Sequence, residues 1–203
     1  PKASIVDVLQ SYSLKAGDRI LVDTGVYTNN SDLSISGSIS GMSTNPVIIQ
    51  GSTNFNSSGT VLDRQSGSYG FYIADTEYIQ LRYFNILNAS TAVRLDGSDN
   101  CLVEGVKVSG GDTAFSVNGG VSNVFMNCLA QGASVNGLYS YNGSPTIWRN
   151  GVLWSNAVGV YLYRGSLTFE NSVIGAFGPG AYAFVSQEHA TINQLVSDYN
   201  NIF

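Results

Sequence analysis

Six segments of this chain repeat one pattern at intervals of 22 or 23 residues. Each segment holds short runs of alternating apolar residues between polar, glycine-rich corners, and none holds an apolar pattern of helix length. Short strands at a fixed period predict the stacked coils of a parallel β-helix, an all-β solenoid. The six segments begin near Gly70, Ala92, Ala114, Gly137, Gly159 and Ala181.

Residues one period apart should lie over one another in such a stack, about 4.8 Å apart. One column is apolar almost throughout and is predicted to face the core: Leu81, Val103, Phe125, Trp148, Phe169 and Thr191. Two positions later, after Tyr83 and Gly105, the column continues as Asn127, Asn150, Asn171 and Asn193. We predict an inward asparagine ladder there, in which each amide bonds its neighbours and the corner backbone.

The column between these two is predicted to point outward, because successive strand residues face opposite sides. It consists of Arg82, Glu104, Met126, Arg149, Glu170 and Ile192. Arg82 would lie beside Glu104, and Arg149 beside Glu170. Two interpretations stay open: a charged sugar-binding strip, or surface ion pairs worth roughly 0–1 kcal/mol each.

A second outward surface is more distinctive. Alternation places Val93, Phe115, Leu138, Val160 and Tyr182 inward with the residues two positions after each. Four tyrosines then form a solvent-facing square: Tyr139, Tyr141, Tyr161 and Tyr163. Arg94, Asp96, Asn118, Asn142 and Arg164 are predicted to lie nearby. Aromatic rings that stack on sugars, with polar side chains beside them, suit a glycan. Alternatively, the tyrosines stabilise the sheet or lie under another domain.

Composition restricts the possible functions. The chain has 203 residues, 43% of them hydrophobic, which is enough to bury a core in one domain. Its net charge is −5 and its pI about 4.6, which argue against nucleic acid and anionic membranes as partners. Charge also disfavours a polyanionic substrate, unless Arg94 and Arg164 form a local basic patch.

The residues that usually hold metals are scarce. Cys101 and Cys128 fall at different phases of neighbouring coils, so we expect two small buried thiols rather than a disulfide. His189 is the only histidine, which leaves a histidine metal site or a Ser-His-Asp triad poorly supported. We expect no metal and no cofactor. A Ca²⁺ ion between Asp96 and Asp99 stays open, although two carboxylates this close are common in corners.

The two ends of the chain suggest a fragment of a longer protein. Ile5 to Tyr12 reads as an amphipathic helix that covers the first coil. The first residues carry no signal-peptide pattern, no apolar run reaches membrane-spanning length, and the last residues, 200–203, look like the middle of a further coil. We expect one β-helix domain: residues 1–42 as cap and first coil, 43–69 as an irregular coil, and 70–203 as six regular coils.

The first 51 residues contain three runs that are found in a known group. They are Ala16-Gly17-Asp18-Arg19-Ile20-Leu21-Val22, then Gly25-Val26-Tyr27, then Asn45-Pro46-Val47-Ile48-Ile49-Gln50-Gly51. These runs resemble the start of right-handed parallel β-helix repeat proteins, which include pectate-lyase-like polysaccharide lyases, C5-epimerases and repeats of large bacterial surface proteins. The resemblance covers the whole chain and implies the right-handed fold. It leaves activity open, because this fold serves many functions.

A lyase of this type removes the C5 proton of a uronate and needs a basic residue, with a cation to stabilise the developing charge. Arg94 and Lys107 are the candidates on one coil with Asp96, Asp99 and Glu104, but they are predicted on different faces. A hydrolase of this type would carry Asn-x-Asp, Asp-Asp and Gly-His-Gly segments, which are missing from the sequence. Glu188 and His189 are adjacent and should point apart. The catalytic residues therefore stay unknown.

We expect a repeat domain of a large extracellular or cell-surface protein, which binds glycans or acts as a structural or adhesive element. Its partners would be a polysaccharide and further coils of the same parent chain. The alternative is part of a polysaccharide lyase or C5-epimerase that acts on an acidic glycan. A third reading is a stalk with no small ligand, which would leave the tyrosine face unused.

Overall fold

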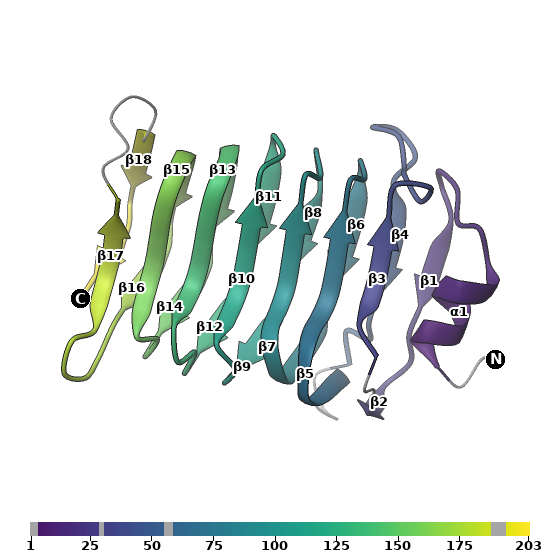
Figure 1. Cartoon of the computed structure of the whole chain (residues 1–203), viewed down its shortest axis with the longest axis horizontal. Helices are drawn as coiled ribbons and strands as arrows, with labels where there is room; N and C mark the ends of the chain where they lie inside the picture. Colours follow the sequence, from purple (N-terminus) through teal and green to yellow (C-terminus); the bar gives the residue numbers. More distant parts are fainter. Residues whose placement is uncertain (1–3, 29–30, 55–58, 188–193) are drawn as a thin grey trace.

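A computed structural model describes residues 4–28, 31–54, 59–187 and 194–203. The chain forms one short helix and then a stack of parallel strands (Figure 1). Every strand pairs in parallel with a strand one coil away. The all-β parallel solenoid with an N-terminal helix is therefore confirmed.

Each coil contributes to three sheets. The first sheet contains β1 (Arg19–Leu21), β4 (Val47–Gln50), β6 (Ile79–Arg82), β8 (Leu102–Glu104), β11 (Asn123–Met126), the later parts of β13 (Asn136–Arg149) and β15 (Val158–Glu170), and β18 (Gln194–Asp198). The second contains β2 (Gly25–Thr28), the early parts of β5 (Thr60–Ala74) and β7 (Phe84–Asp96), β9 (Lys107–Ser109), β12 (Leu129–Gln131), β14 (Val152–Trp154), β16 (Val173–Gly175) and β19 (Asn201–Ile202). The third contains β3 (Leu33–Ser36), the later parts of β5 and β7, β10 (Thr113–Asn118), the early parts of β13 and β15, and β17 (Tyr182–Ser186).

Helix α1 (Ile5–Ser11) lies at the N-terminal end of the stack (Figure 1). The hydroxyl oxygen of Ser4 accepts the backbone N–H of Asp7 at 3.4 Å and caps its first turn. Ile5 is buried, and Val6, Val8 and Leu9 pack partly against the core. Tyr12, predicted as the last residue of the apolar side, lies beyond the helix and is 54% exposed.

The predicted core column is confirmed as far as Phe169. Leu81, Val103, Phe125, Trp148 and Phe169 are all at most 1% exposed and are aligned by strand pairing. The ring of Trp148 lies within 5.3, 5.8 and 6.2 Å of Phe115, Phe125 and Phe169, measured between centroids. Thr191 lies outside the described residues, and the residue paired with Phe169 is Ser197, so this end of the column was wrong.

The inward asparagine ladder was also wrong. Asn127, Asn150 and Asn171 do stack at one corner, but their side chains are exposed. Their φ angles lie between 48° and 55°, in the left-handed region, and Gly105 occupies the same corner with φ 63°. Asparagine and glycine tolerate this conformation, so the column marks a bend of the backbone rather than a buried amide ladder. Asn193 lies outside the described residues.

Inward asparagines occur elsewhere in the stack. Asn156 is fully buried; its side-chain oxygen accepts the N–H of Ala133 at 2.9 Å, and its nitrogen donates to the carbonyl of Ala130 at 3.2 Å. Two other asparagines bond the preceding coil in the same way: Asn123 and Asn200. Each amide satisfies two backbone groups at a corner where strand pairing stops.

Candidate functional site

The third sheet presents the tyrosines predicted to face outward. Its strands β7, β10, β13 and β15 bury their inward residues and align their outward ones. Tyr139 on β13 pairs with Tyr161 on β15. On its other side, Tyr139 pairs with Ser116 on β10. Tyr182 was predicted inward but is 59% exposed; Phe184 pairs with Val160 in its place.

The four tyrosines form two pairs of neighbouring, tilted rings. Ring centroids are 5.6 Å apart for Tyr139 and Tyr161 and 5.0 Å apart for Tyr141 and Tyr163, and the planes of both pairs are inclined by 33°. All four are partly exposed, which leaves ring surface for a ligand. Partial burial raises the pKa of Tyr139, and the neighbouring tyrosines add to that rise. The hydroxyl of Tyr161 donates to Gln187 at 3.0 Å.

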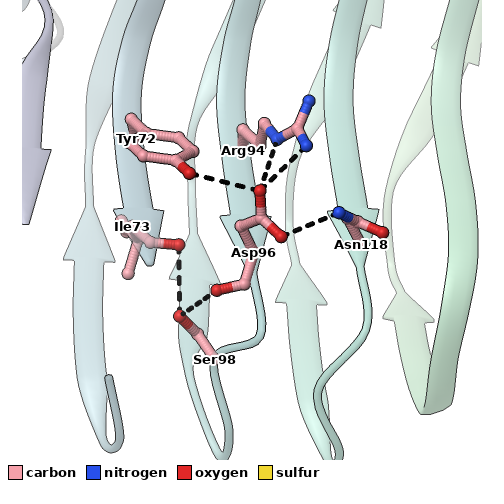
Figure 2. A network of polar contacts seen from close by, with 6 residues as sticks. All are labelled: Tyr72, Ile73, Arg94, Asp96, Ser98 and Asn118. Carbon is pink, nitrogen blue, oxygen red and sulfur yellow. Dashed lines mark hydrogen bonds and ion pairs between the residues drawn. The ribbon is translucent and has the colours of Figure 1, made fainter. Parts of the chain in front are cut away.

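Arg94, Asp96 and Asn118 are brought together as predicted, on β7 and β10 (Figure 2). One oxygen of Asp96 accepts from Arg94 at 2.8 and 3.2 Å and from the hydroxyl of Tyr72 at 3.2 Å. The other oxygen accepts from the amide of Asn118 at 2.8 Å. Three neighbouring strands are thereby linked through one carboxylate.

Two tyrosines of this surface were missed. Tyr72 pairs with Arg94 in the third sheet, and Tyr69 stacks on Tyr72 at 5.1 Å between centroids. The guanidinium carbon of Arg94 lies 5.8 Å from the ring centroid of Tyr69 and 6.0 Å from that of Tyr72. The same alternation, extended one coil toward the N-terminus from Arg94, points to Tyr72. We name the following residues the glycan face, after the ligand expected from the sequence: Tyr69, Tyr72, Arg94, Asp96, Asn118, Tyr139, Tyr141, Tyr161, Tyr163 and Arg164.

Arg164 lies at the other end of this face from Arg94. Its guanidinium carbon is 5.8 Å from the ring centroid of Tyr163, and a register shift pairs its backbone with Tyr141. Strands β10 and β13 lie between the strands that carry Arg94 and Arg164. The two arginines therefore do not form the local basic patch that was considered from the sequence.

The residues considered for proton abstraction are not assembled. Arg94 lies on the third sheet, whereas Lys107 lies on β9 in the second sheet. Glu104 is paired with Arg82 at 3.3 Å, and Glu170 with Arg149 at 2.6 Å, so the outward charged column forms the ion pairs of the simpler interpretation. Glu188, His189 and Ile192 lie outside the described residues.

Within the described ranges, no three His, Cys, Asp or Glu side chains gather closely enough to hold a metal ion. Asp99, considered with Asp96 for Ca²⁺, accepts the N–H of Val121 at 2.8 Å, while Asp96 binds Arg94 and Asn118. Cys101 and Cys128 are buried free thiols. Burial raises the pKa of Cys101 to about 11 and that of Cys128 to about 12, which keeps both thiols protonated and unreactive at neutral pH.

Other surface features lie away from the glycan face. Trp154 points outward from the second sheet and is 37% exposed. Its ring lies 4.6 Å from that of Phe177. Two cavities of about 380 and 220 Å³ lie between helix α1 and the first coil, and Ile5 and Tyr27 line both.

Comparisons with known proteins agree on the fold. Residues 69–203 match the family model described as "Right handed beta helix region", which supports the handedness that the resemblance implied. A comparison with curated protein sequences found no match.

The solved structures that share this architecture include three polysaccharide lyases. A rhamnogalacturonan lyase superposes with a TM-score of 0.71 at 16% identity, over 98% of this chain and 58% of that one. The pectate lyase Pel9A gives 0.56 at 14% identity, over 94% and 70% of the two chains. An alginate lyase from Paenibacillus sp. str. FPU-7 gives 0.53 at 12% identity, over 97% and 96%. Identities this low relate the chain to polysaccharide lyases by fold alone, and it spans 58% of the rhamnogalacturonan lyase.

Proposed function

This chain belongs to the right-handed β-helix family, and we propose that its third sheet binds a polysaccharide. The observation that carries the proposal is the alignment of the tyrosine pairs on β13 and β15. Sugar rings present C–H faces that stack on aromatic rings, while hydroxyl groups bond to polar side chains. The glycan face offers both kinds of group on neighbouring strands.

The spacing of the stack supports an extended glycan. Strands of the third sheet follow one another about 4.8 Å apart, which is close to the length of one pyranose unit in an extended chain. From Tyr72 to Tyr161 the face crosses β5, β7, β10, β13 and β15. A polysaccharide that lies along the solenoid axis would therefore place about one sugar on each coil, with tyrosines at both ends of the path.

The competing explanation is that the tyrosines only stabilise the sheet. Aromatic pairs on adjacent strands contribute roughly 0.2–1 kcal/mol each without any ligand. The two explanations differ in what a double substitution removes. Loss of Tyr139 and Tyr161 abolishes glycan binding if the rings form a platform, whereas it only lowers stability if they are structural.

The test is a glycan array and polysaccharide pull-down with the native chain and Tyr139→Ala/Tyr161→Ala. The matched control is Tyr12→Ala/Tyr199→Asn, which removes two tyrosines that are 54% and 85% exposed and lie off the face; asparagine suits the left-handed φ of 51° at Tyr199. We expect the control to bind as the native chain does and the face variant to lose binding with unchanged β-sheet circular dichroism. Binding retained by the face variant would contradict the proposal.

We also propose an extracellular or cell-surface location, in a larger protein whose further coils continue the stack. Polysaccharides are found there, and three polysaccharide lyases share the fold. In the described part of the chain, no helix has the length and apolar character needed to span a membrane.

The alternative function is that the chain forms part of a polysaccharide lyase or C5-epimerase. Its support is the fold likeness to the rhamnogalacturonan lyase, with a TM-score of 0.71. Against it stands Arg94, whose guanidinium is paired with Asp96 rather than free to abstract a proton. Incubation with pectate, alginate and rhamnogalacturonan separates the two functions: a lyase releases unsaturated uronates that absorb ultraviolet light, an epimerase exchanges the C5 proton with solvent deuterium, and a binder does neither.

A further inference from the structure

Three charged side chains lie on the glycan face, where β5, β7, β10, β13 and β15 are described: Arg94, Asp96 and Arg164. Their arrangement decides which class of glycan the face accepts. A free cation would attract the carboxylates of an acidic polysaccharide, whereas a compensated one would not. The inference drawn here rests on the proposed function and concerns the charge of its ligand.

Arg94 is a compensated cation. Its Nε and one terminal nitrogen donate to the same oxygen of Asp96, at 3.2 and 2.8 Å (Figure 2). Its guanidinium also lies near the rings of Tyr69 and Tyr72. Burial is the largest single influence and opposes the charge, but Asp96 and these two tyrosines together raise the pKa of Arg94. The arginine is thus ionised, held in place, and neutralised by its neighbour.

Both carboxylate oxygens of Asp96 already accept hydrogen bonds. The oxygen that does not bind Arg94 accepts from the amide of Asn118 at 2.8 Å. Burial raises the pKa of Tyr72 most, and the charge and hydrogen bond of Asp96 raise it further. The hydroxyl of Tyr72 therefore stays a neutral donor. The centre of the face consequently offers neutral hydroxyl, amide and ring surfaces.

The margins of the face are acidic. Asp75 follows the last residue of β5 and donates its backbone N–H to the carbonyl of Asp96 at 2.9 Å. Asp99 lies beyond the end of β7, and Asp112 directly precedes β10. Hydrogen bonds from Ser90 and Ser134 lower the pKa of Asp112, so it is ionised at neutral pH. Two cations on the face are thus outnumbered by Asp96 and the three carboxylates of its margins.

We propose that the glycan face selects a neutral polysaccharide over its carboxylated counterpart. The other arginine of the face, Arg164, lies at the far end, where its guanidinium carbon is 5.8 Å from the ring centroid of Tyr163. Repeated carboxylates along an acidic chain would meet the acidic margins as well as this single cation. The net charge of −5 acts in the same direction at longer range.

The test uses pairs of polymers that share a backbone, in which one member is neutral and the other carries carboxylates. Amylose and cellulose oligomers are compared with their C6-oxidised forms, and methyl-esterified polygalacturonate with the free acid, by calorimetry at low and high salt. We expect the neutral member of any pair that binds to bind about tenfold or more tightly, with an affinity that salt leaves unchanged. The acidic member should bind more weakly at low salt and gain affinity as salt is added.

The variant Asp96→Asn provides the converse test. Asparagine keeps the shape and one acceptor oxygen but removes the charge that neutralises Arg94. We expect affinity for the acidic polymers to rise about tenfold at low salt and to fall again as salt is added. Asp63→Asn serves as the matched control, because it makes the same change of net charge in the second sheet, away from the glycan face, and it should keep the neutral preference.

The outcomes separate this inference from the proposed function. Equal or tighter binding of the acidic member by the native chain would overturn the neutral selectivity and leave polysaccharide binding in place. An Asp96→Asn variant that folds normally but gains no affinity for acidic polymers would also overturn it. If neither member of any pair binds and no glycan on the array binds, both the neutral selectivity and the proposed polysaccharide binding are overturned.

Discussion

Arg94 and Asp96 stand two residues apart on the same side of β7 and form an ion pair of 2.8 Å. Because Tyr72 and Asn118 bond to the same carboxylate, Asp96 links β5, β7 and β10. Replacing Asp96 with alanine leaves a charge and two polar groups without their acceptor. We expect Asp96→Ala to lower the free energy of unfolding by about 1–3 kcal/mol and Asp96→Asn by less, measured by urea denaturation. An alanine variant as stable as the native chain would contradict this role.

Trp148 allows a paired test of the core. It is fully buried among three phenylalanine rings, and its indole N–H is one of the buried polar atoms that have no hydrogen-bond partner in the described structure. Trp148→Ala should cost about 3–5 kcal/mol through the cavity it leaves. Trp148→Phe keeps an aromatic ring and removes the unpaired donor, so it should cost less than about 1.5 kcal/mol. Equal losses for the two variants would argue against this packing.

The two kinds of corner asparagine should respond oppositely to substitution. Asn156→Ala strands the backbone groups of Ala130 and Ala133 and should cost about 1–3 kcal/mol. Asn127→Gly should be nearly neutral, because glycine tolerates φ near 55°, whereas Asn127→Ala should cost about 1–2 kcal/mol. Thermal unfolding of the three variants gives the order of their stabilities. A large loss of stability in Asn127→Gly would contradict the exposed position of Asn127 and support the inward asparagine ladder instead.

Alkaline pH should destabilise the chain through its thiols. Burial raises the pKa of Cys128 from 9.0 to about 12, so the folded state holds this proton more tightly than the unfolded state. The resulting stability is complete below pH 9 and is lost as pH rises toward 12, by about 1 kcal/mol between pH 9 and 10. Cys101, raised to about 11, acts in the same direction. Denaturation of Cys101→Ala/Cys128→Ala should therefore show a flatter loss over this interval; an unchanged slope would refute the assignment.

The repeat predicted most of the fold because side-chain alternation and a fixed period constrain each other. Leu81, Val103 and Phe125 could be aligned by counting alone, and so could the tyrosine pairs. The prediction of side-chain direction from alternation failed where the backbone leaves the extended conformation. At Asn127 the left-handed φ turns the side chain outward, so the period of two no longer assigns a direction.

Counting also failed where coil length changes. The register between Phe169 and Ser197 spans a longer interval than the regular 22 or 23 residues, so the prediction placed Thr191 there instead. The link between Arg94 and Asp96 could not be predicted either, because alternation shows that both face outward but not that they neutralise each other. Charge selectivity thus depends on rotamers, which a repeat pattern does not specify.

The most direct test of polysaccharide binding is an NMR titration with ring-labelled tyrosine, in which the 12 tyrosines report separately. Cellohexaose and a methyl-esterified oligogalacturonate serve as ligands. We predict that signals of Tyr139, Tyr141, Tyr161 and Tyr163 shift with increasing ligand, while those of the exposed Tyr12 and Tyr199 do not. Shifts confined to Tyr12 or Tyr199, or none at saturating ligand, would contradict a glycan-binding third sheet.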